Sequence, residues 1–195
     1  MQGAPLRHIE AVQQTLTEKG EWGAALRRMA DSLGSGAIVG LVGPRGTGKT
    51  QLALRAMLWA GADAEKRAKE KDAGRGSEDA ARAAARYTTA MGLFLSLKQT
   101  FSDGAKETER DAIEKWCWLP LLVIDECQER GESAWENRIL THIIDRRYGA
   151  MLDTILIANL TPEEFSASMG ESVIDRIRET GTLIECNWPS FRTKA

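Results

Sequence analysis

One eight-residue stretch, Gly43-Pro44-Arg45-Gly46-Thr47-Gly48-Lys49-Thr50, constrains what this chain can fold into more than any other part of it. It matches the pattern Gly-x-x-x-x-Gly-Lys-Ser/Thr at every position. Glycines allow the backbone to form a concave nest of N–H donors, and the N-terminus of a following helix adds a partial positive charge. The stretch therefore predicts a phosphate-binding P-loop. A glycine-rich turn that binds nothing is the alternative.

The flanking sequence supplies the elements that such a loop needs. Residues 38–42 are predicted to form a short buried strand, and residues 49–60 a helix that is apolar on most sides. In this arrangement Lys49 is expected to contact the β- and γ-phosphates of ATP, and the Thr50 hydroxyl to be a ligand of Mg²⁺. We therefore expect ATP and Mg²⁺ as ligands, with residues 43–50 and the following Gln51 binding the nucleotide.

A second apolar run, residues 119–124, ends in the acidic pair Asp125-Glu126. Such a run is typical of a central parallel strand that is buried on both faces, with its acids at the carboxyl end. There Asp125 can hold Mg²⁺, and Glu126 can polarise an attacking water, which favours hydrolysis. Asn159 follows the next buried strand and could bind the attacking water or the γ-phosphate. The alternatives are an N-cap for the acids and an ordinary turn for Asn159.

The order of predicted elements indicates the fold class. Five strands alternate with helices, which predicts an α/β domain with a parallel sheet and helices on both faces. We expect this domain to span residues 36–195, preceded by a short helical extension in residues 1–35. Residues 61–86 carry many charges of both signs and no large apolar side chain. This composition predicts a solvated, flexible insertion.

Composition limits the remaining functions. The formal net charge of −2 predicts that any nucleic-acid site is a local patch. The three cysteines, Cys117, Cys127 and Cys186, lack metal-ligand spacing and favour buried, reduced thiols in a cytoplasmic protein. The apolar runs are strand-sized, so neither a membrane span nor a signal peptide is predicted.

Several segments resemble the DnaC-type helicase loaders and their IstB-type relatives. These are the P-loop, the run Leu-Leu-Val-Ile-Asp-Glu, the strand-end Asn159, and residues 141–148, 175–178 and 187–192. The resemblance covers most of residues 36–195. It implies an AAA+-type P-loop NTPase with a five-stranded parallel sheet in the order 5-1-4-3-2 and no C-terminal helical lid.

The same resemblance implies residue roles and partners. Lys49 and Thr50 correspond to Walker A, Asp125 and Glu126 to Walker B, and Asn159 to sensor 1. Arg176 matches the arginine finger that acts in trans within a homo-oligomer, although an ion pair with Asp175 or Glu179 on the same helix is the alternative. Single-stranded DNA and a replicative helicase are the implied partners.

Two features bear on how the chain acts. The basic residues Lys98 and Lys106 lie where the resemblance places a DNA-facing helical element, although both could simply be solvated. The 35 residues before the domain are fewer than those with which helicase loaders bind the helicase. A transposition helper ATPase of IstB type, or an ATP-gated DNA-binding module with negligible turnover, are the rival functions.

Overall fold

The computed structural model describes residues 2–13, 20–70, 83–102, 107–131 and 133–192. Its helices are α1 (Leu6–Gln13), α2 (Gly20–Ser32), α3 (Lys49–Glu70), α5 (Ala90–Lys98), α6 (Glu109–Cys117), α7 (Ala134–Gly149), α8 (Pro162–Met169) and α9 (Glu171–Thr180), with 3₁₀ turns η1 (Gln99–Phe101) and η2 (Cys127–Glu129). Its strands are β1 (Ile38–Val42), β2 (Ala85–Thr89), β3 (Leu121–Asp125), β4 (Asp153–Ile157) and β5 (Thr182–Glu185).

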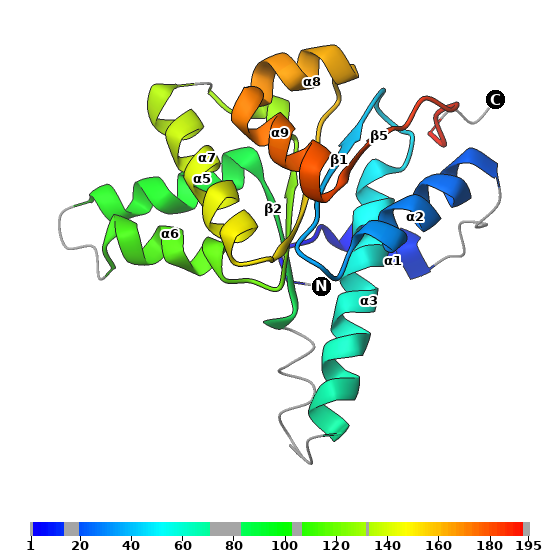
Figure 1. Cartoon of the computed structure of the whole chain (residues 1–195), viewed down its shortest axis with the longest axis horizontal. Helices are drawn as coiled ribbons and strands as arrows, with labels where there is room; N and C mark the ends of the chain where they lie inside the picture. The colour runs from blue at the N-terminus through cyan, green and yellow to red at the C-terminus, as the bar shows by residue number, and fades with distance from the viewer. Residues whose placement is uncertain (1, 14–19, 71–82, 103–106, 132, 193–195) are drawn as a thin grey trace.

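The strands form one five-stranded sheet in the order β2-β3-β4-β1-β5, and all four pairings are parallel. This confirms the predicted order. The strand that precedes the P-loop, β1, is an inner strand between β4 and the edge strand β5. Because β4 lies between β1 and β3, the carboxyl ends of these three strands meet at one edge of the sheet (Figure 1).

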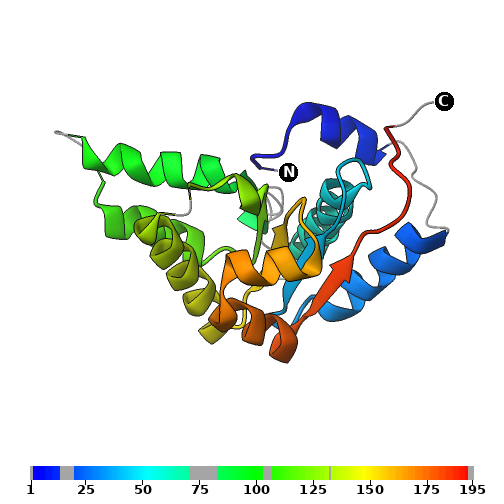
Figure 2. The ribbon, with the colours of Figure 1, turned by 90° about the horizontal axis from the view of Figure 1, so that it is seen from above.

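Helices cover both faces of the sheet, as predicted, because successive strand side chains point to opposite sides. On one side, Val39 and Leu41 of β1 pack with buried residues of α2 and α3. On the other side, Ile38 and Val42 pack with buried residues of α5, α6, α7, α8 and α9. Figure 2 shows these two helical layers on either side of the strands. The strands are therefore buried on both faces, which explains their continuous apolar runs.

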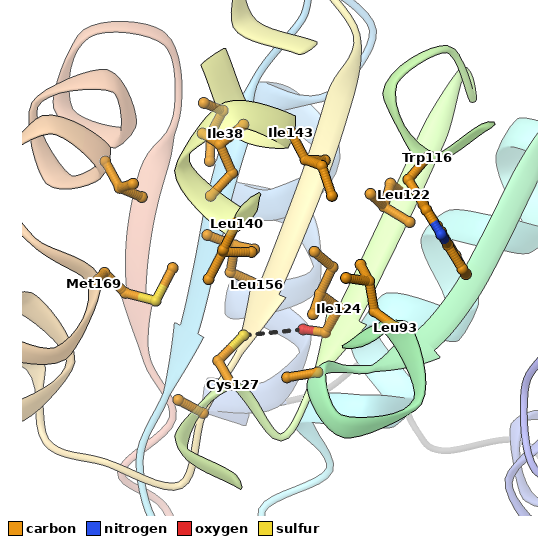
Figure 3. Packing of buried hydrophobic residues seen from close by; sticks show 14 of the residues in the cluster. Ile38, Leu93, Trp116, Leu122, Ile124, Cys127, Leu140, Ile143, Leu156 and Met169 are labelled. Carbon is orange, nitrogen blue, oxygen red and sulfur yellow. Dashed lines mark hydrogen bonds between the residues drawn. The ribbon is translucent and has the colours of Figure 1, made fainter. Parts of the chain in front are cut away.

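The core under α7 illustrates how tightly the second layer is packed. Leu140 and Ile143 of α7 lie over Leu156 of β4 and Ile38 of β1, and all four are at most 3% exposed (Figure 3). Cys127 sits at the lower end of this cluster, where its thiol donates to the carbonyl of Ile124. Packing at this density fixes the end of β3, where the acidic pair begins.

Helix α3 is longer than the sequence predicts. It runs to Glu70, so residues 61–70, expected to be part of a flexible insertion, continue the helix. Two i,i+4 ion pairs, Asp63–Arg67 at 2.7 Å and Glu65–Lys69 at 2.6 Å, support this part. Alanine, glutamate, lysine and arginine also favour helix, which outweighs the lack of a buried face. Residues 71–82 lie outside the described part of the chain.

None of the described helices is both long enough and apolar enough to cross a lipid bilayer.

Arg147 is an unusual member of the core, because its side chain is fully buried. Burial lowers the pKa of its guanidinium to about 10. The guanidinium donates hydrogen bonds to the Thr154 hydroxyl at 2.8 Å, to the carbonyls of Trp116 at 3.0 Å and Leu119 at 2.8 Å, and to the carbonyl of Asp153. One side chain thus ties α7 to the entry of β3 and to β4.

We expect Arg147→Met to lower the free energy of unfolding by about 3 kcal/mol or more, because several buried carbonyls would lose their donor. Urea denaturation followed by circular dichroism measures this. Arg146→Met is the matched control, since the Arg146–Glu114 contact of 3.4 Å is partly exposed and should contribute about 0–1 kcal/mol. Equal stabilities of the two variants would contradict this role.

Candidate nucleotide-binding site

The P-loop connects the buried strand β1 to the N-terminus of α3, as predicted. Gly46 and Gly48 adopt φ angles of +87° and +81°, which residues with a Cβ rarely adopt. The amide of Gly43 donates to the carbonyl of Leu160 at 2.8 Å, which fixes the start of the loop to the exit of β4. The side chain of Arg45 points outward and pairs with Glu129 at 3.2 Å. The loop backbone, not the Arg45 side chain, therefore forms the cradle.

Lys49 is 5% exposed, and its ammonium donates to the carbonyls of Gly43 at 2.7 Å and Pro44 at 2.6 Å. The ammonium is therefore held at the start of the loop by neutral acceptors. Burial lowers its pKa, nearby Asp125 opposes the shift, and Arg192 reinforces it. Among the described residues, no carboxylate pairs directly with this ammonium. A desolvated cation in that position is suited to bind an anion, because the anion supplies the missing countercharge.

Asp125 lies at the end of β3 and is 5% exposed. Its Oδ2 accepts hydrogen bonds from the Thr50 hydroxyl at 2.7 Å and from the Tyr87 hydroxyl at 2.8 Å, and its Oδ1 accepts from the Glu126 amide at 2.7 Å. The structure thus brings together Thr50 and Asp125, the two predicted metal ligands, which are 75 positions apart.

The sequence did not single out Tyr87 as a site residue. Its phenol is 6% exposed and orients Asp125 from the neighbouring strand β2. Burial and the adjacent Asp125 raise the pKa of Tyr87, so the phenol stays a donor at neutral pH. The register pairs Tyr87 with Val123, two residues before Asp125. From the sequence, Tyr87 could have been linked to Asp125 only by knowing that β2 pairs with β3.

The residues fit a magnesium ion. A hydroxyl and a carboxylate are hard oxygen donors, which Mg²⁺ prefers, and Mg²⁺ is commonly held by one or two protein groups together with phosphates and waters. Within the part of the chain that the structure describes, no group of three or more His, Cys, Asp or Glu side chains could hold a metal by itself. Thr50 and Asp125 are therefore the protein ligands that the site offers.

Glu126 follows in an exposed position, with φ 55° and ψ 44°. This left-handed conformation is uncommon for a residue with a side chain and is found at active sites. It places Glu126 between the buried Asp125 and the 3₁₀ turn η2. Glu126 occupies the N-cap position of η2, as the N-cap alternative expects, but its side chain makes no capping hydrogen bond there.

Asn159 lies two residues beyond β4, at the edge between β1 and β3. Its backbone amide donates to the side chain of Gln128 in η2 at 3.0 Å. The neighbouring amide of Ala158 donates to Leu41 of β1 at 3.0 Å. The loop that carries Asn159 is thus tied to β1 and to η2, which follows β3, at the edge where the P-loop and the acidic pair lie.

Gln51 is also predicted to bind the nucleotide. Its side chain is 8% exposed, and its amide nitrogen lies 3.2 Å from the Nδ1 and 3.3 Å from the carbonyl oxygen of His8 in α1. The amide nitrogen of Gln51 thus contacts α1, whereas its buried amide oxygen has no hydrogen-bond partner among the described residues.

Arg176 projects from α9, and its contacts involve α7 and α9, not the P-loop. Its guanidinium lies 3.0 Å from Asp145 and 5.4 Å from the ring centroid of Tyr148, and it also donates to Ser172. The expected local alternative, a pair with Asp175 or Glu179, is wrong: Asp175 pairs with Arg178, and Glu179 accepts from Tyr148. These contacts of Arg176 are therefore to α7 and α9 of the same chain.

Two basic residues, Lys98 and Lys106, were predicted as candidates for DNA contacts. Lys98 lies 3.2 Å from Glu136, a carboxylate whose side chain is 7% exposed, and above the ring of Trp135. The side chain of Lys98 is nevertheless 50% exposed, so its charge also faces solvent. Lys106 lies outside the described residues.

All three cysteines are buried and free, as predicted. Burial raises the pKa of Cys117 to about 11, and those of Cys127 and Cys186 to about 12. The thiols are therefore neutral at physiological pH. They are buried packing residues, not nucleophiles.

Comparison with known proteins gives sequence relatives over about half of the chain. The replicative helicase loader DnaC of Buchnera aphidicola (subspecies Acyrthosiphon pisum) is 33% identical over 105 residues, which cover 53% of this chain and 43% of that protein. DnaC of Escherichia coli K12 is 32% identical over 107 residues, 54% and 43% of the two chains. The chain thus matches less than half of the length of these relatives. No family model matches.

Solved structures extend the likeness to nearly the whole fold. A structure of the DnaC helicase loader superposes with a TM-score of 0.64 at 20% identity, covering 93% of this chain and 99% of that chain. The DnaI structure gives 0.59 at 19% identity, covering 97% and 94%. The replication initiator DnaA, bound to AMPPCP and single-stranded DNA, gives 0.61 at 19% identity, covering 89% and 48%.

The resemblance inferred from the sequence is confirmed. The chain is similar to the DnaC-type replicative helicase loaders over about half of its length, and its fold is the P-loop AAA+ fold of the DnaC, DnaI and DnaA structures.

Proposed function

We propose that the protein is an ATP-hydrolysing AAA+ protein of helicase-loader type that binds single-stranded DNA and assists the loading of a replicative helicase in DNA replication, in the cytoplasm. The single observation that carries the ATPase part is the 2.7 Å hydrogen bond between Thr50 of the P-loop and Asp125 of β3. It joins the two motifs in the arrangement that magnesium-dependent phosphate chemistry requires.

In this proposal each residue of the site has one task. Backbone amides of the P-loop and the Lys49 ammonium hold the phosphates, so Lys49 exchanges the carbonyls of Gly43 and Pro44 for phosphate oxygens. Thr50 and Asp125 would hold Mg²⁺, which supplies neutralisation of phosphate charge. Glu126 accepts a proton from the attacking water, because its exposed position gives water access.

Two further residues complete the proposed chemistry. Asn159 orients the attacking water or the γ-phosphate from the loop after β4. Arg176 stabilises the transition-state charge in the site of a neighbouring subunit, which makes the active form a homo-oligomer. Support comes from its side chain, which is 22% exposed on the surface of α9 and has no contact with its own P-loop.

The DNA and helicase parts rest on the relatives. DnaC is named a replicative helicase loader, and the DnaA structure contains single-stranded DNA. Because the chain matches 43% of the DnaC of Buchnera, docking to a helicase is the part of the proposal that the likeness supports least. Lys98 remains a candidate for DNA contacts, because its side chain is 50% exposed although it pairs with Glu136. Met91, Leu95 and Phe101 of the same α5–η1 region are 47–56% exposed.

We expect Lys49→Ala to abolish tight ATP binding, because it removes the main side-chain charge on the phosphates. Isothermal titration with MgATP measures this, and fluorescence anisotropy of labelled single-stranded DNA, with and without ATP, measures the coupled DNA binding. Lys69→Ala, at the far end of α3, is the control and should bind like the wild type. Wild-type ATP affinity of the Lys49 variant would refute the nucleotide site, whereas ATP binding without phosphate release would favour an ATP-gated binding module.

A further inference from the structure

Three residues from outside the P-loop donate hydrogen bonds to its backbone: Trp22 of α2, and Trp188 and Phe191 of the segment after β5. We call these three residues the brace. After β5 the chain continues along the loop between β1 and α3, with α2 close by (Figures 1 and 2). The indole of Trp188 donates to the carbonyl of Thr47 at 2.8 Å, and the amide of Phe191 donates to the carbonyl of Gly46 at 2.9 Å. The indole of Trp22 in α2 reaches the carbonyl of Gly48 at 3.4 Å.

The three acceptor carbonyls belong to consecutive residues of the P-loop, Gly46, Thr47 and Gly48. In a planar trans peptide the C=O and the following N–H point in opposite directions. Holding the carbonyls of Gly46 and Thr47 toward the brace therefore directs the amides of Thr47 and Gly48 to the other side. The carbonyl of Gly48 is held chiefly by the first turn of α3, where it accepts from the amide of Leu52 at 3.0 Å. An anion nest needs such a run of convergent amides, and in P-loops these amides cradle the phosphates.

The fit between brace and loop is close. A Cβ on Gly46 would lie 2.0 Å from the hydroxyl of Ser190, and one on Gly48 would lie 2.9 Å from the indole nitrogen of Trp22. Thr47 is 1% exposed and Trp22 is 4% exposed, so both indole bonds are shielded from water on at least one side. Without such donors, flexible glycine peptides could rotate, and the nest would have to be ordered by the ligand.

We propose that Trp188, assisted by Phe191 and Trp22, is a positioning residue that pre-orients the P-loop amides, so that nucleotide affinity depends on the segment that follows β5. The inference rests on the proposed nucleotide site. The brace acts on the phosphate cradle itself, so it affects ADP, ATP and inorganic tripolyphosphate alike. It makes no contact with the reacting atoms.

The test compares Trp188→Phe, which removes the N–H and keeps most of the ring, with Trp118→Phe as the matched control. Trp118 also donates its indole N–H to an oxygen, that of Glu114 on α6, away from the P-loop. We expect Trp188→Phe to weaken ADP and tripolyphosphate binding by about 5- to 15-fold, the loss of one buried hydrogen bond. Trp22→Phe should weaken it by about 2- to 3-fold, because its bond is longer.

A second readout separates positioning from general stability. Amide hydrogen exchange of a peptide covering residues 43–52 should accelerate in nucleotide-free Trp188→Phe, whereas a peptide covering α7 should not change. If Trp188→Phe fails to fold, Phe191→Pro tests the same brace, because it removes the N–H that bonds Gly46 together with the phenyl ring that lies beside Gly48.

The binding measurements separate failure of the nucleotide site from failure of the brace. Wild-type protein that binds neither ADP nor tripolyphosphate refutes the nucleotide site and the brace with it. If the wild type binds ADP and tripolyphosphate, and Trp188→Phe and Trp22→Phe bind them with the same affinity, the brace is refuted and the nucleotide site stands. Weaker ADP binding with unchanged tripolyphosphate binding also refutes it, because the effect would then lie in contacts to the nucleoside.

Discussion

Replacing Arg176 by alanine is expected to abolish ATP hydrolysis while leaving ATP binding and the fold intact. A guanidinium remains charged at all working pH values, so its role in catalysis is charge stabilisation. An arginine finger supplied to a neighbour contributes about 10³–10⁵ in rate. Loss of hydrolysis on this scale is measured as phosphate release under saturating ATP.

The fold should tolerate this change. The Arg176–Asp145 pair is 3.0 Å long, with side-chain exposures of 22% and 43%, and a partly exposed pair contributes about 0–1 kcal/mol. The stacking on Tyr148 adds a similarly small amount. Arg178→Ala is the matched control, since Arg178 lies on the same helix and pairs with Asp175 at 3.1 Å. It should retain full activity.

A mixing experiment tests whether Arg176 acts in trans. Lys49→Ala and Arg176→Ala are each expected to be inactive, but a mixed oligomer contains sites with an intact Lys49 facing a neighbour with an intact Arg176. Mixing should therefore restore part of the turnover. No recovery at any ratio, with both variants folded and co-assembled, would show that Arg176 does not serve a neighbouring site.

Glu126→Gln is expected to bind ATP like the wild type and to hydrolyse it about 10²- to 10⁴-fold more slowly, because an amide cannot accept a proton from water. Binding is preserved because Asp125, not Glu126, makes the contacts to Thr50 and Tyr87. Single-turnover phosphate release separates the chemical step from binding.

Glu129→Gln is the control for this change. Glu129 is another exposed acid close by, in η2, and pairs with Arg45. Its replacement should leave the rate within about twofold. Turnover of the Glu126 variant within the same twofold range would mean that Glu126 is not the base and that its left-handed conformation has another cause.

The sequence alone determined those features that depend on neighbouring residues or on strand periodicity. The P-loop could be read directly, because a phosphate nest needs glycines, a lysine and a helix start within eight consecutive positions. The acidic pair and Asn159 could be placed at one edge of the sheet, because parallel strands end on the same side. The charged composition of residues 61–70 led to the prediction of a flexible insertion, whereas the structure shows a helix with ion pairs. The same composition is compatible with both.

Only the tertiary structure decided which distant side chains complete the site. Tyr87 bonds Asp125 across 38 positions, and Trp188 bonds Thr47 across 141. The fully buried Arg147 and the attachment of Gln51 to α1 are likewise absent from any local pattern. The identity of a tyrosine, tryptophan or arginine does not reveal whether it lies in a core, on a surface or beside a phosphate loop. The packing of the elements selects its partner, because a hydrogen bond depends on distances of about 3 Å that spacing along the chain does not encode.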